Sequence, residues 1–389
     1  MILFWHFIKY LSIVILMFFF IFTNKKPKIS YINNQQQLAE VLVLLKQQTH
    51  LAIDTEFYRQ NTYYPELCLL QIAFSHKKQT HVMLIDCLVD LCLTDFWQII
   101  LDEKITKIMH SALQDLQIFY RYIKEKPKNI IDTQIMANFC GFDFNIGYAN
   151  LLKQTLNKNI NKDQQNSDWR KRPLSQKQLD YAMGDVLNLC DVSQKLQKIL
   201  QKNQMLPSFY EEMTKFIDEI ESPDCFHLVN KVLHKNNQPQ HQQLINLVLL
   251  REKWAKIHNV SRQKILKDDD FLKFIDNASL WQNQFNQQMI LDFNNQHYLN
   301  DAWRYYYANN QILKKQKALK KITQEITQEI TFAKNICQQF LLSNKHINKI
   351  ISDFINHKPI NIVAIIGNWR YNLYGSKLEN TIKQWKNTL

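Results

Sequence analysis

Residues 51–57 read Leu-Ala-Ile-Asp-Thr-Glu-Phe, an apolar stretch of strand-forming residues that contains two acids two positions apart. In a strand, alternate side chains lie on the same face, so Asp54 and Glu56 point the same way from a segment that favours burial. Two neighbouring carboxylates repel each other, and partial burial raises the cost of charging both. Such oxygen ligands suit Mg²⁺ or Mn²⁺, whereas zinc prefers His or Cys. The stretch therefore predicts a strand with a divalent metal site, and a pair of solvated loop acids is the alternative.

Two later segments supply further acids. Residues 108–116 read Ile-Met-His-Ser-Ala-Leu-Gln-Asp-Leu, which predicts a short strand leading into a helix with Asp115 in its first turns. Further along, Tyr181 and Asp185 stand four positions apart, on one face of a predicted helix for which Ser175 is a favourable N-cap. The chain thus offers carboxylates from three separated segments to one site.

The order Asp-x-Glu, His-x-x-x-x-Asp and Tyr-x-x-x-Asp resembles the 3′→5′ exonucleases that use four acids and a tyrosine. Other segments resemble ribonuclease D specifically, and they read Thr62-Tyr63-Tyr64-Pro65-Glu66-Leu67, Leu70-Gln71, Ile131-Asp132-Thr133-Gln134, Ser167-Asp168-Trp169 and Arg172-Pro173-Leu174-Ser175. The resemblance covers residues 28–206. Met183-Gly184 departs from it, since relatives carry small residues such as alanine there, but no ligand position is changed.

The resemblance implies an α/β ribonuclease-H-like exonuclease domain, a mixed sheet flanked by helices, over residues 28–206. The residue pattern agrees, because closely spaced strand signals are followed by alternating helices and strands. The expected strands cover residues 29–32, the Asp54 segment, 67–74, 81–85 and 106–109, and the expected helices cover 35–46 and 95–101.

After about residue 206 strand signals nearly vanish and helical periodicity takes over. Residues 246–268 resemble the first helicase-and-RNase-D C-terminal (HRDC) domain, which we expect over residues 207–310. Residues 362–378 resemble the second all-α HRDC domain, expected over 311–389. Five lysines between the stretches 246–268 and 362–378 are candidates for holding a nucleic-acid backbone, with a solvated helix face as the alternative. They are Lys314, Lys315, Lys317, Lys320 and Lys321.

The resemblance also implies the chemistry, which is removal of nucleoside 5′-monophosphates from the 3′ end of RNA, with tRNA precursors as substrates. Asp54, Glu56 and Asp185 are then expected to hold one of two Mg²⁺ or Mn²⁺ ions. Asp54 is expected to bridge to the second ion, and Asp115 to support it. Since the ordinary pKa of tyrosine is about 10, Tyr181 is a poor base at neutral pH, and we expect it to orient the attacking water by hydrogen bonding.

Three residues near these acids are candidates for substrate contacts, with simple packing as the alternative for each. Phe57 is a candidate for stacking on the terminal base, His110 for a strand-end position near the substrate, and Gln114 for contact with sugar or phosphate. Asp132 and Asp168 are expected to have local turn or cap roles.

Composition narrows the possible function classes. The net charge of +13 favours a polyanionic substrate, although free use of lysine by an AT-rich genome explains it equally well. The 5 glycines are too scattered for a Walker loop or a dinucleotide-binding turn. The 7 cysteines form no C-x-x-C pair and predict reduced core residues in a cytoplasmic protein. We expect a monomer with no protein partner.

The N-terminal extension, residues 1–27, is hydrophobic. Leu11 to Phe22 is almost wholly apolar and is followed by three lysines. A signal peptide is disfavoured, because it would carry basic residues before its apolar core and small residues at its end. A membrane anchor would keep the rest of the chain in the cytoplasm by the positive-inside rule. We prefer a start codon assigned too early, and expect membrane contact only if residues 1–23 are translated and inserted.

Two other functions compete with RNA trimming. A 3′-5′ DNA exonuclease would use the same carboxylates, and only contacts to the 2′-hydroxyl distinguish the two polymers. A non-catalytic nucleic-acid-binding scaffold would keep the fold without the activity. The complete set of four acids and a tyrosine argues against the scaffold.

Overall fold

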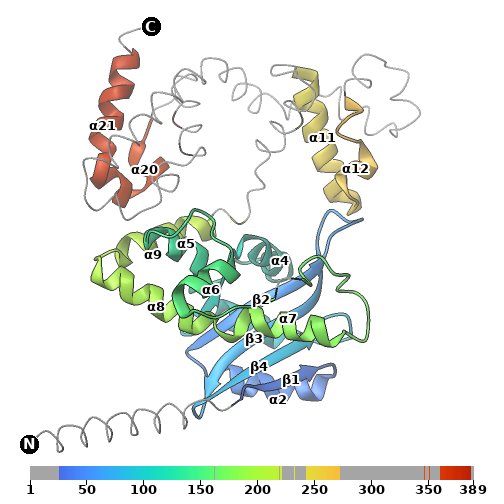
Figure 1. The fold of residues 1–389 in the computed structure, drawn as a ribbon. Helices are drawn as coiled ribbons and strands as arrows, with labels where there is room; N and C mark the ends of the chain where they lie inside the picture. The colour runs from blue at the N-terminus through green and yellow to red at the C-terminus, as the bar shows by residue number, and fades with distance from the viewer. Residues whose placement is uncertain are drawn as a thin grey trace, which may run out of the picture. The chain divides into compact units, whose positions relative to one another are not determined.

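The computed structural model describes residues 26–161, 163–218, 242–271 and 360–386, with the single residues 220, 232, 346 and 350 (Figure 1). The chain divides into two compact units. The first unit comprises Met1–Tyr58, Leu67–Gln134 and Gly147–Leu196. The second unit comprises Arg59–Glu66, Ile135–Ile146 and Gln197–Leu389.

The chain up to residue 202 contains all of the strands that the structure describes, with helices between and after them. Its elements are β1 (Lys28–Ile32), α2 (Gln35–Leu45), β2 (His50–Tyr58), β3 (Glu66–His76), β4 (Gln79–Asp86), α3 (Thr94–Leu101), β5 (Thr106–Met109), α4 (Leu113–Ile123), β6 (Ile130–Asp132), α5 (Thr133–Phe139), α6 (Tyr148–Leu156), α7 (Gln176–Leu187) and α8 (Leu189–Lys202). The elements that follow are α9 (Leu206–Asp218), α11 (Gln242–His258), α12 (Arg262–Ile265), α20 (Ile362–Ile366) and α21 (Asn368–Lys386).

The six strands form one mixed sheet in the order β1-β4-β3-β2-β5-β6. β3 and β4 pair antiparallel, whereas β1 with β4, β2 with β5, and β5 with β6 pair parallel. The predicted mixed sheet is therefore confirmed. β2 lies inside the sheet, between β3 and β5, and its residues Leu51, Ala52 and Ile53 are completely buried.

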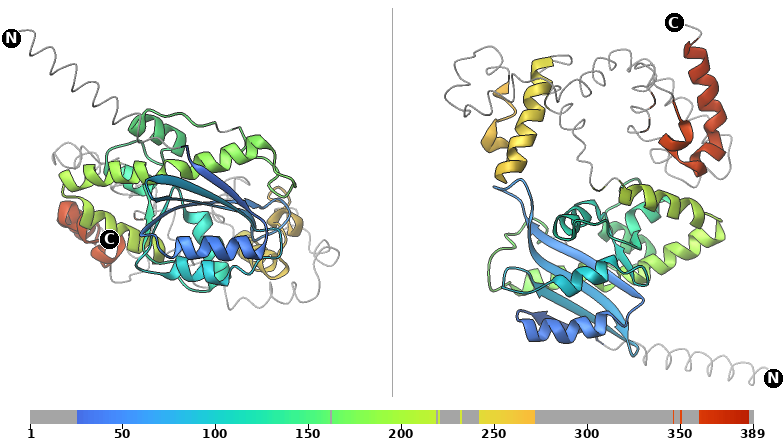
Figure 2. Two further views of the ribbon diagram at one scale, coloured as in Figure 1. Left: turned by 90° about the horizontal axis from the view of Figure 1, so that it is seen from below. Right: turned by 180° about the vertical axis from the view of Figure 1, so that it is seen from behind.

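Helices cover both faces of the sheet (Figure 2). α7 contacts β2 and β4, and α2 and α3 lie on the opposite side of the sheet from α7 in the left view of Figure 2. α2 shows why such helices form here, because its buried residues Leu38, Val41, Leu42 and Leu45 follow the spacing of one helix face. Its polar face remains in water, and Asn34 caps its N-terminus through a hydrogen bond from the backbone N–H of Gln37.

Among the described residues, only helices follow α8, as the change of pattern after residue 206 predicts. Residues 1–25 and the five lysines between 314 and 321 lie outside the described residues. No helix in the described part of the chain is both long enough and apolar enough to cross a bilayer. The described cysteines are free, but Cys92 is exposed, so the prediction of a core residue is wrong for it. It lies in the loop that leads into α3.

Candidate functional site

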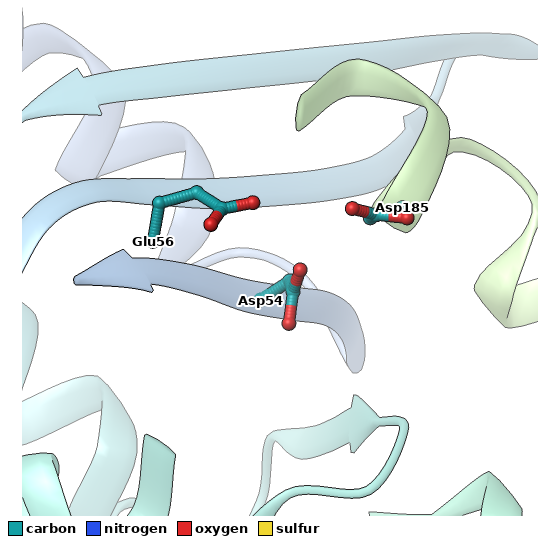
Figure 3. A group of neighbouring side chains, drawn as sticks. All are labelled: Asp54, Glu56 and Asp185. Carbon is teal, nitrogen blue, oxygen red and sulfur yellow. The ribbon is translucent and has the colours of Figure 1, made fainter. Parts of the chain in front are cut away.

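β2 places two acids on one face. The side chains of Asp54 and Glu56 extend from this strand in the same direction because residues two apart in a strand share a face (Figure 3). Glu56 is only 9% exposed and Asp54 is partly buried. The acids therefore belong to a sheet-interior strand, which excludes the alternative of solvated loop acids.

α7 supplies the next two groups. Ser175 begins this helix with a capping box, in which its side chain accepts from the backbone N–H of Gln178 and the Gln178 side chain accepts from the backbone N–H of Ser175. This confirms the predicted cap. The capping box sets where the helix begins, and the helix contacts β2. Tyr181 and Asp185 therefore lie one turn apart on a helix that is held against this strand.

Three carboxylates converge between these elements. Oxygen atoms of Asp54, Glu56 and Asp185 all lie within 4.8 Å of one another. Figure 3 shows the first two side chains extending from β2, and Asp185 facing them from α7. The fold thus brings together acids that the sequence places in separate segments.

Asp115 is the fourth acid of this group. It lies in the first turn of α4, is 6% exposed, and accepts a hydrogen bond from the hydroxyl of Thr55, the residue between the two acids of β2. Its charge acts on both Asp54 and Glu56. The Thr55 bond therefore links the helix that carries Asp115 to the strand that carries the other acids.

Burial and mutual repulsion shift the ionisation of these groups. The pKa of Asp54 is raised well above its ordinary value, first by desolvation and then by the charges of Asp115, Asp185 and Glu56. Desolvation, Asp185 and Asp115 raise the pKa of Glu56 to about 9. Desolvation raises the pKa of Asp115 to about 7, against the opposing effect of the Thr55 hydrogen bond. These carboxylates are therefore stabilised in the folded chain either by binding a proton or by a nearby cation.

A divalent cation fits this donor set. The three converging ligands are all carboxylate oxygens, which hard ions such as Mg²⁺ and Mn²⁺ prefer. A cation would offset the repulsion that raises the pKa values of Asp54 and Glu56. The site is thus an acidic cluster suited to a divalent metal.

Tyr181 lies beside the cluster. Desolvation and the charges of Asp185, Glu56 and Asp54 raise its pKa above the ordinary value, and a hydrogen bond to the Asp185 side chain acts in the same direction. The ring of Trp169 lies 6.0 Å from the ring of Tyr181, at an interplanar angle of 45°. Tyr181 therefore stays protonated at neutral pH and its ring is held by packing.

The loop before α7 is anchored to the sheet through Arg172. Its guanidinium donates from Nε and Nη2 to the two oxygens of Asp86, both at 2.6 Å, and from Nη2 to the carbonyl of Cys68 at 2.9 Å. The hydroxyl of Tyr31 donates to the same carboxylate at 2.6 Å. Since Asp86 ends β4, this network fixes the entry to the helix that bears Tyr181 and Asp185.

The three candidates for substrate contact lie in different surroundings. Phe57 is partly exposed at the end of β2, and Gln114 is exposed at the start of α4. His110 follows β5, and its Nδ1 lies 2.9 Å from the hydroxyl of Thr133. That hydroxyl donates to the carbonyl of Met109, so it accepts from His110, whose Nδ1 carries the proton.

Asp168 has the predicted local turn role, whereas Asp132 combines a local hydrogen bond with two from residues 20 and 21 positions earlier. Asp132 accepts hydrogen bonds from the backbone N–H groups of Ser111, Ala112 and Gln134, and so joins the loop after β5 to the start of α5. Asp168 accepts from the backbone N–H of Arg170 within its turn. Neither belongs to the group of converging ligands.

One residue near the acids was not predicted from the sequence. Tyr148, at the start of α6, is 9% exposed, and the charges of Asp185 and Asp54 raise its pKa after desolvation, which is the largest cause. Its ring lies 5.5 Å from that of His110. Its position depends on how α6 packs near His110, and a single tyrosine after Gly147 gives no signal of that packing in the sequence.

Comparisons with known proteins agree with this geometry. Residues 29–201 match the sequence profile of a family described as 3′-5′ exonuclease, and this range contains all four acids and Tyr181. A ribonuclease D from Granulibacter bethesdensis is 32% identical over 253 residues, which make up 64% of this chain and 63% of the relative. The chain is similar to bacterial ribonuclease D.

The likeness to ribonuclease D also extends beyond the exonuclease part. A ribonuclease D from Cronobacter turicensis is 27% identical over 375 residues, covering 91% of this chain and all of that protein. The crystal structure of Escherichia coli RNase D is similar with a TM-score of 0.73 at 25% identity, over 92% of this chain and 99% of that one. In the alignments with the first curated relatives, however, the chain spans only about three fifths of their length.

Proposed function

We propose that the chain is a metal-dependent 3′-5′ exoribonuclease that hydrolyses the terminal phosphodiester of RNA and releases nucleoside 5′-monophosphates. The convergence of Asp54, Glu56 and Asp185 beside Tyr181 carries the proposal. The similar E. coli enzyme is described as an exoribonuclease involved in structured RNA processing. We therefore further propose precursors of tRNA with 3′ extensions as substrates.

The acids would hold the metal. Asp54, Glu56 and Asp185 would bind one Mg²⁺ or Mn²⁺, and Asp54 would share a second ion that Asp115 supports. When bound, the ions would neutralise charge on the phosphodiester and lower the pKa of the attacking water. The hydrogen bond from Thr55 fixes the orientation of Asp115, and the capping box of α7 fixes the position of Asp185.

Tyr181 would orient the attacking water. Because its pKa is raised, its hydroxyl keeps its proton at neutral pH and would orient the water by hydrogen bonding rather than act as a general base. Packing against Trp169 limits rotation of the ring. The water would thereby be aligned for in-line attack on the terminal phosphorus.

Phe57, His110 and Gln114 are proposed to contact the 3′-terminal nucleotide. Phe57 follows Glu56 on β2 and offers an aromatic surface for the base. His110 is held at the end of β5 by Thr133, and Gln114 lies one residue before Asp115. Each would place a group of the nucleotide near the carboxylates.

We also propose that residues 28–206 form the exonuclease domain, and that residues 207–310 and 311–389 form two HRDC domains in a monomer acting in the cytoplasm. The helical character of α9, α11 and α21 supports the domain proposal. The free cysteines of the described residues support a reducing compartment.

The test is a shortening assay with the full chain. A 3′-extended tRNA transcript and a single-stranded DNA of matched sequence are incubated with Mg²⁺, Mn²⁺ or EDTA, and the products are separated by length and chromatography. We expect stepwise loss from the 3′ end of the RNA with 5′-monophosphate products, and none in EDTA. Faster shortening of DNA would favour the DNA exonuclease, and binding without shortening would favour the scaffold.

A further inference from the structure

A second cluster of charged side chains lies within the unit that contains residues 59–66 and α11. Three arginines, Arg59, Arg251 and Arg262, line a cavity of about 210 Å³. Thr62, Ser261 and Asp268 also line it. None of these residues belongs to the acidic cluster, and the proposed exonuclease chemistry does not use them.

Ion pairs hold two of the arginines in place. Nη1 of Arg251 lies 2.5 Å from Oδ1 of Asp268, and the Arg251 side chain is only 3% exposed. Arg262 donates from Nε and Nη2 to the two oxygens of Glu252, at 2.5 and 2.8 Å. The Arg262 guanidinium also lies 4.9 Å from the ring centroid of Tyr63, whose hydroxyl donates to Glu252. The walls of the cavity are therefore preorganised.

Two arginines retain donors that the described residues do not satisfy. Nε of Arg251 is buried and has no hydrogen-bond partner there. Arg59 donates from Nε to the carbonyl of Tyr63 at 3.1 Å, and within the described ranges its terminal nitrogens make no hydrogen bond. Arg59 is an exposed residue, so water can satisfy its terminal nitrogens until a ligand binds them. Nε of Arg251 is a buried donor, and a buried donor without an acceptor costs free energy, so an acceptor that reached it would stabilise the cavity.

The charge balance also favours an anion. Three guanidiniums face two carboxylates, Asp268 and Glu252, which leaves one positive charge. Lys256 adds another, with its Nζ 5.7 Å from the Tyr63 ring centroid. Desolvation and the like charge of Arg262 lower the pKa of Arg59. The surplus positive charge is thus concentrated where the unused donors are.

We propose that this cavity binds a phosphate group of the RNA strand. The planar guanidinium group of arginine can donate two parallel hydrogen bonds to two oxygens of one phosphate. A cavity lined by arginines therefore suits a phosphate ligand. A volume of about 210 Å³ equals the liquid share of roughly seven waters, below the roughly 300–1,000 Å³ of pockets for whole small molecules. It therefore has room for a phosphate with a few waters, and not for a nucleotide. The choice of RNA as the source of the phosphate rests on the proposed function.

The test measures RNA binding without cleavage. Anisotropy of a fluorescent single-stranded RNA is titrated with the full chain in EDTA over a series of salt concentrations. Arg59→Gln should weaken binding by roughly three- to tenfold and reduce the slope of log K against log salt by about 0.7, the value for one phosphate contact on a single strand. Lys264→Gln removes the same charge from an exposed residue of α12 that does not line the cavity, and should change the affinity less than twofold.

A second measurement uses inorganic phosphate at constant ionic strength. Phosphate should raise the thermal midpoint of the wild-type chain relative to chloride, and this rise should be absent in Arg59→Gln. Arg59→Lys keeps the charge, so it should keep the salt slope and lose part of the affinity.

The outcomes separate the two proposals. Equal RNA affinities and slopes for Arg59→Gln and Lys264→Gln would overturn the phosphate site. Stabilisation by phosphate without any effect of Arg59→Gln on RNA would mean a site for a free anion, and would overturn the assignment to RNA. RNA binding that depends on Arg59, in a protein that shortens no RNA with Mg²⁺, would uphold the phosphate site while the exonuclease proposal fails.

Discussion

Glu56 links the chemistry of the site to the stability of the fold. Its pKa is about 9 in the folded chain and 4.5 when unperturbed. Between these values the folded state binds a proton that the unfolded chain does not, so the free energy of unfolding falls as pH rises from about 4.5 to about 9. We expect urea midpoints in EDTA to fall over this range, and less steeply in Glu56→Gln. Saturating Mg²⁺ should oppose this fall in stability, because it binds the ionised carboxylates. An unchanged urea midpoint from pH 5 to 9 in EDTA would contradict the raised pKa of Glu56.

Asp185 illustrates the conflict between function and stability. It contributes to the repulsion that raises the pKa values of Asp54 and Glu56. Asp185→Asn removes that repulsion, so we expect the metal-free protein to gain about 1–2 kcal/mol of stability while it loses metal affinity and turnover. Thermal unfolding in EDTA and calorimetric titration with Mn²⁺ would measure the two effects. A variant that is both less stable and fully able to bind Mn²⁺ would argue against the cluster as a metal site.

The hydroxyl of Tyr181 can be tested by its removal. Tyr181→Phe keeps the ring and its packing against Trp169, but loses the hydroxyl that we assign to orienting the attacking water. We expect kcat to fall by roughly 10²-fold or more, with Mn²⁺ affinity nearly unchanged. Single-turnover digestion of RNA at saturating metal is the appropriate measurement. Turnover equal to that of the wild type would remove Tyr181 from the mechanism.

The sequence was sufficient to predict which acids meet, but not everything around them. Asp54 and Glu56 share a face because of strand periodicity, and Tyr181 and Asp185 lie one turn apart because of helix periodicity; both relations are local. The position of Tyr148 near Asp185 depends instead on how α6 packs, which no local pattern specifies. The hydrogen bond between Thr55 and Asp115 likewise joins residues 60 positions apart.

Among the elements, the loop that leads into α7 depends on one buried ion pair. The side chain of Asp86 is 3% exposed and accepts from Arg172 and Tyr31. Asp86→Ala would leave the Arg172 guanidinium without its carboxylate in a partly buried place, so we expect a loss of about 3–5 kcal/mol. Tyr31→Phe removes one hydrogen bond from the same carboxylate and should cost less, about 1.5–3 kcal/mol. Urea denaturation of both variants gives the comparison, and equal losses would show that the ion pair is not the main anchor.

The first and last residues of the strands and helices were largely predictable from the sequence. The long-range contacts that hold these elements in place were not. The strand predicted over residues 106–109 is observed as β5, and the helix predicted over 95–101 is α3, which begins one residue earlier. These elements follow from hydrophobic periodicity. Asp86 and Arg172 are 86 positions apart, and each taken alone is a common surface residue, so their pairing required the structure.

In the whole molecule, short internal segments join the later helices in one compact unit. Residues 59–66 and 135–146 belong to the unit that contains α9, α11 and α21. The ring of Phe139 lies 4.9 Å from that of Trp369, which is far along the chain. Contacts between residues so far apart in the sequence leave no hydrophobic periodicity by which they could be predicted. The sequence therefore showed only the change to helices after residue 206. The four acids, Tyr181 and Tyr148 all lie in the other unit.

Trp369 provides a test of how independent the two units are. It is 5% exposed and packs on Phe139, and Glu211 accepts hydrogen bonds from the backbone N–H groups of Asn368 and Trp369. Trp369→Ala should therefore cost the second unit about 3–5 kcal/mol and speed hydrogen exchange in α21. Because every proposed metal ligand lies in the first unit, calorimetric affinity for Mn²⁺ should stay within twofold of the wild type. If Mn²⁺ affinity fell together with the stability of α21, the acidic cluster would depend on the C-terminal helices, and the metal site would be a property of both units.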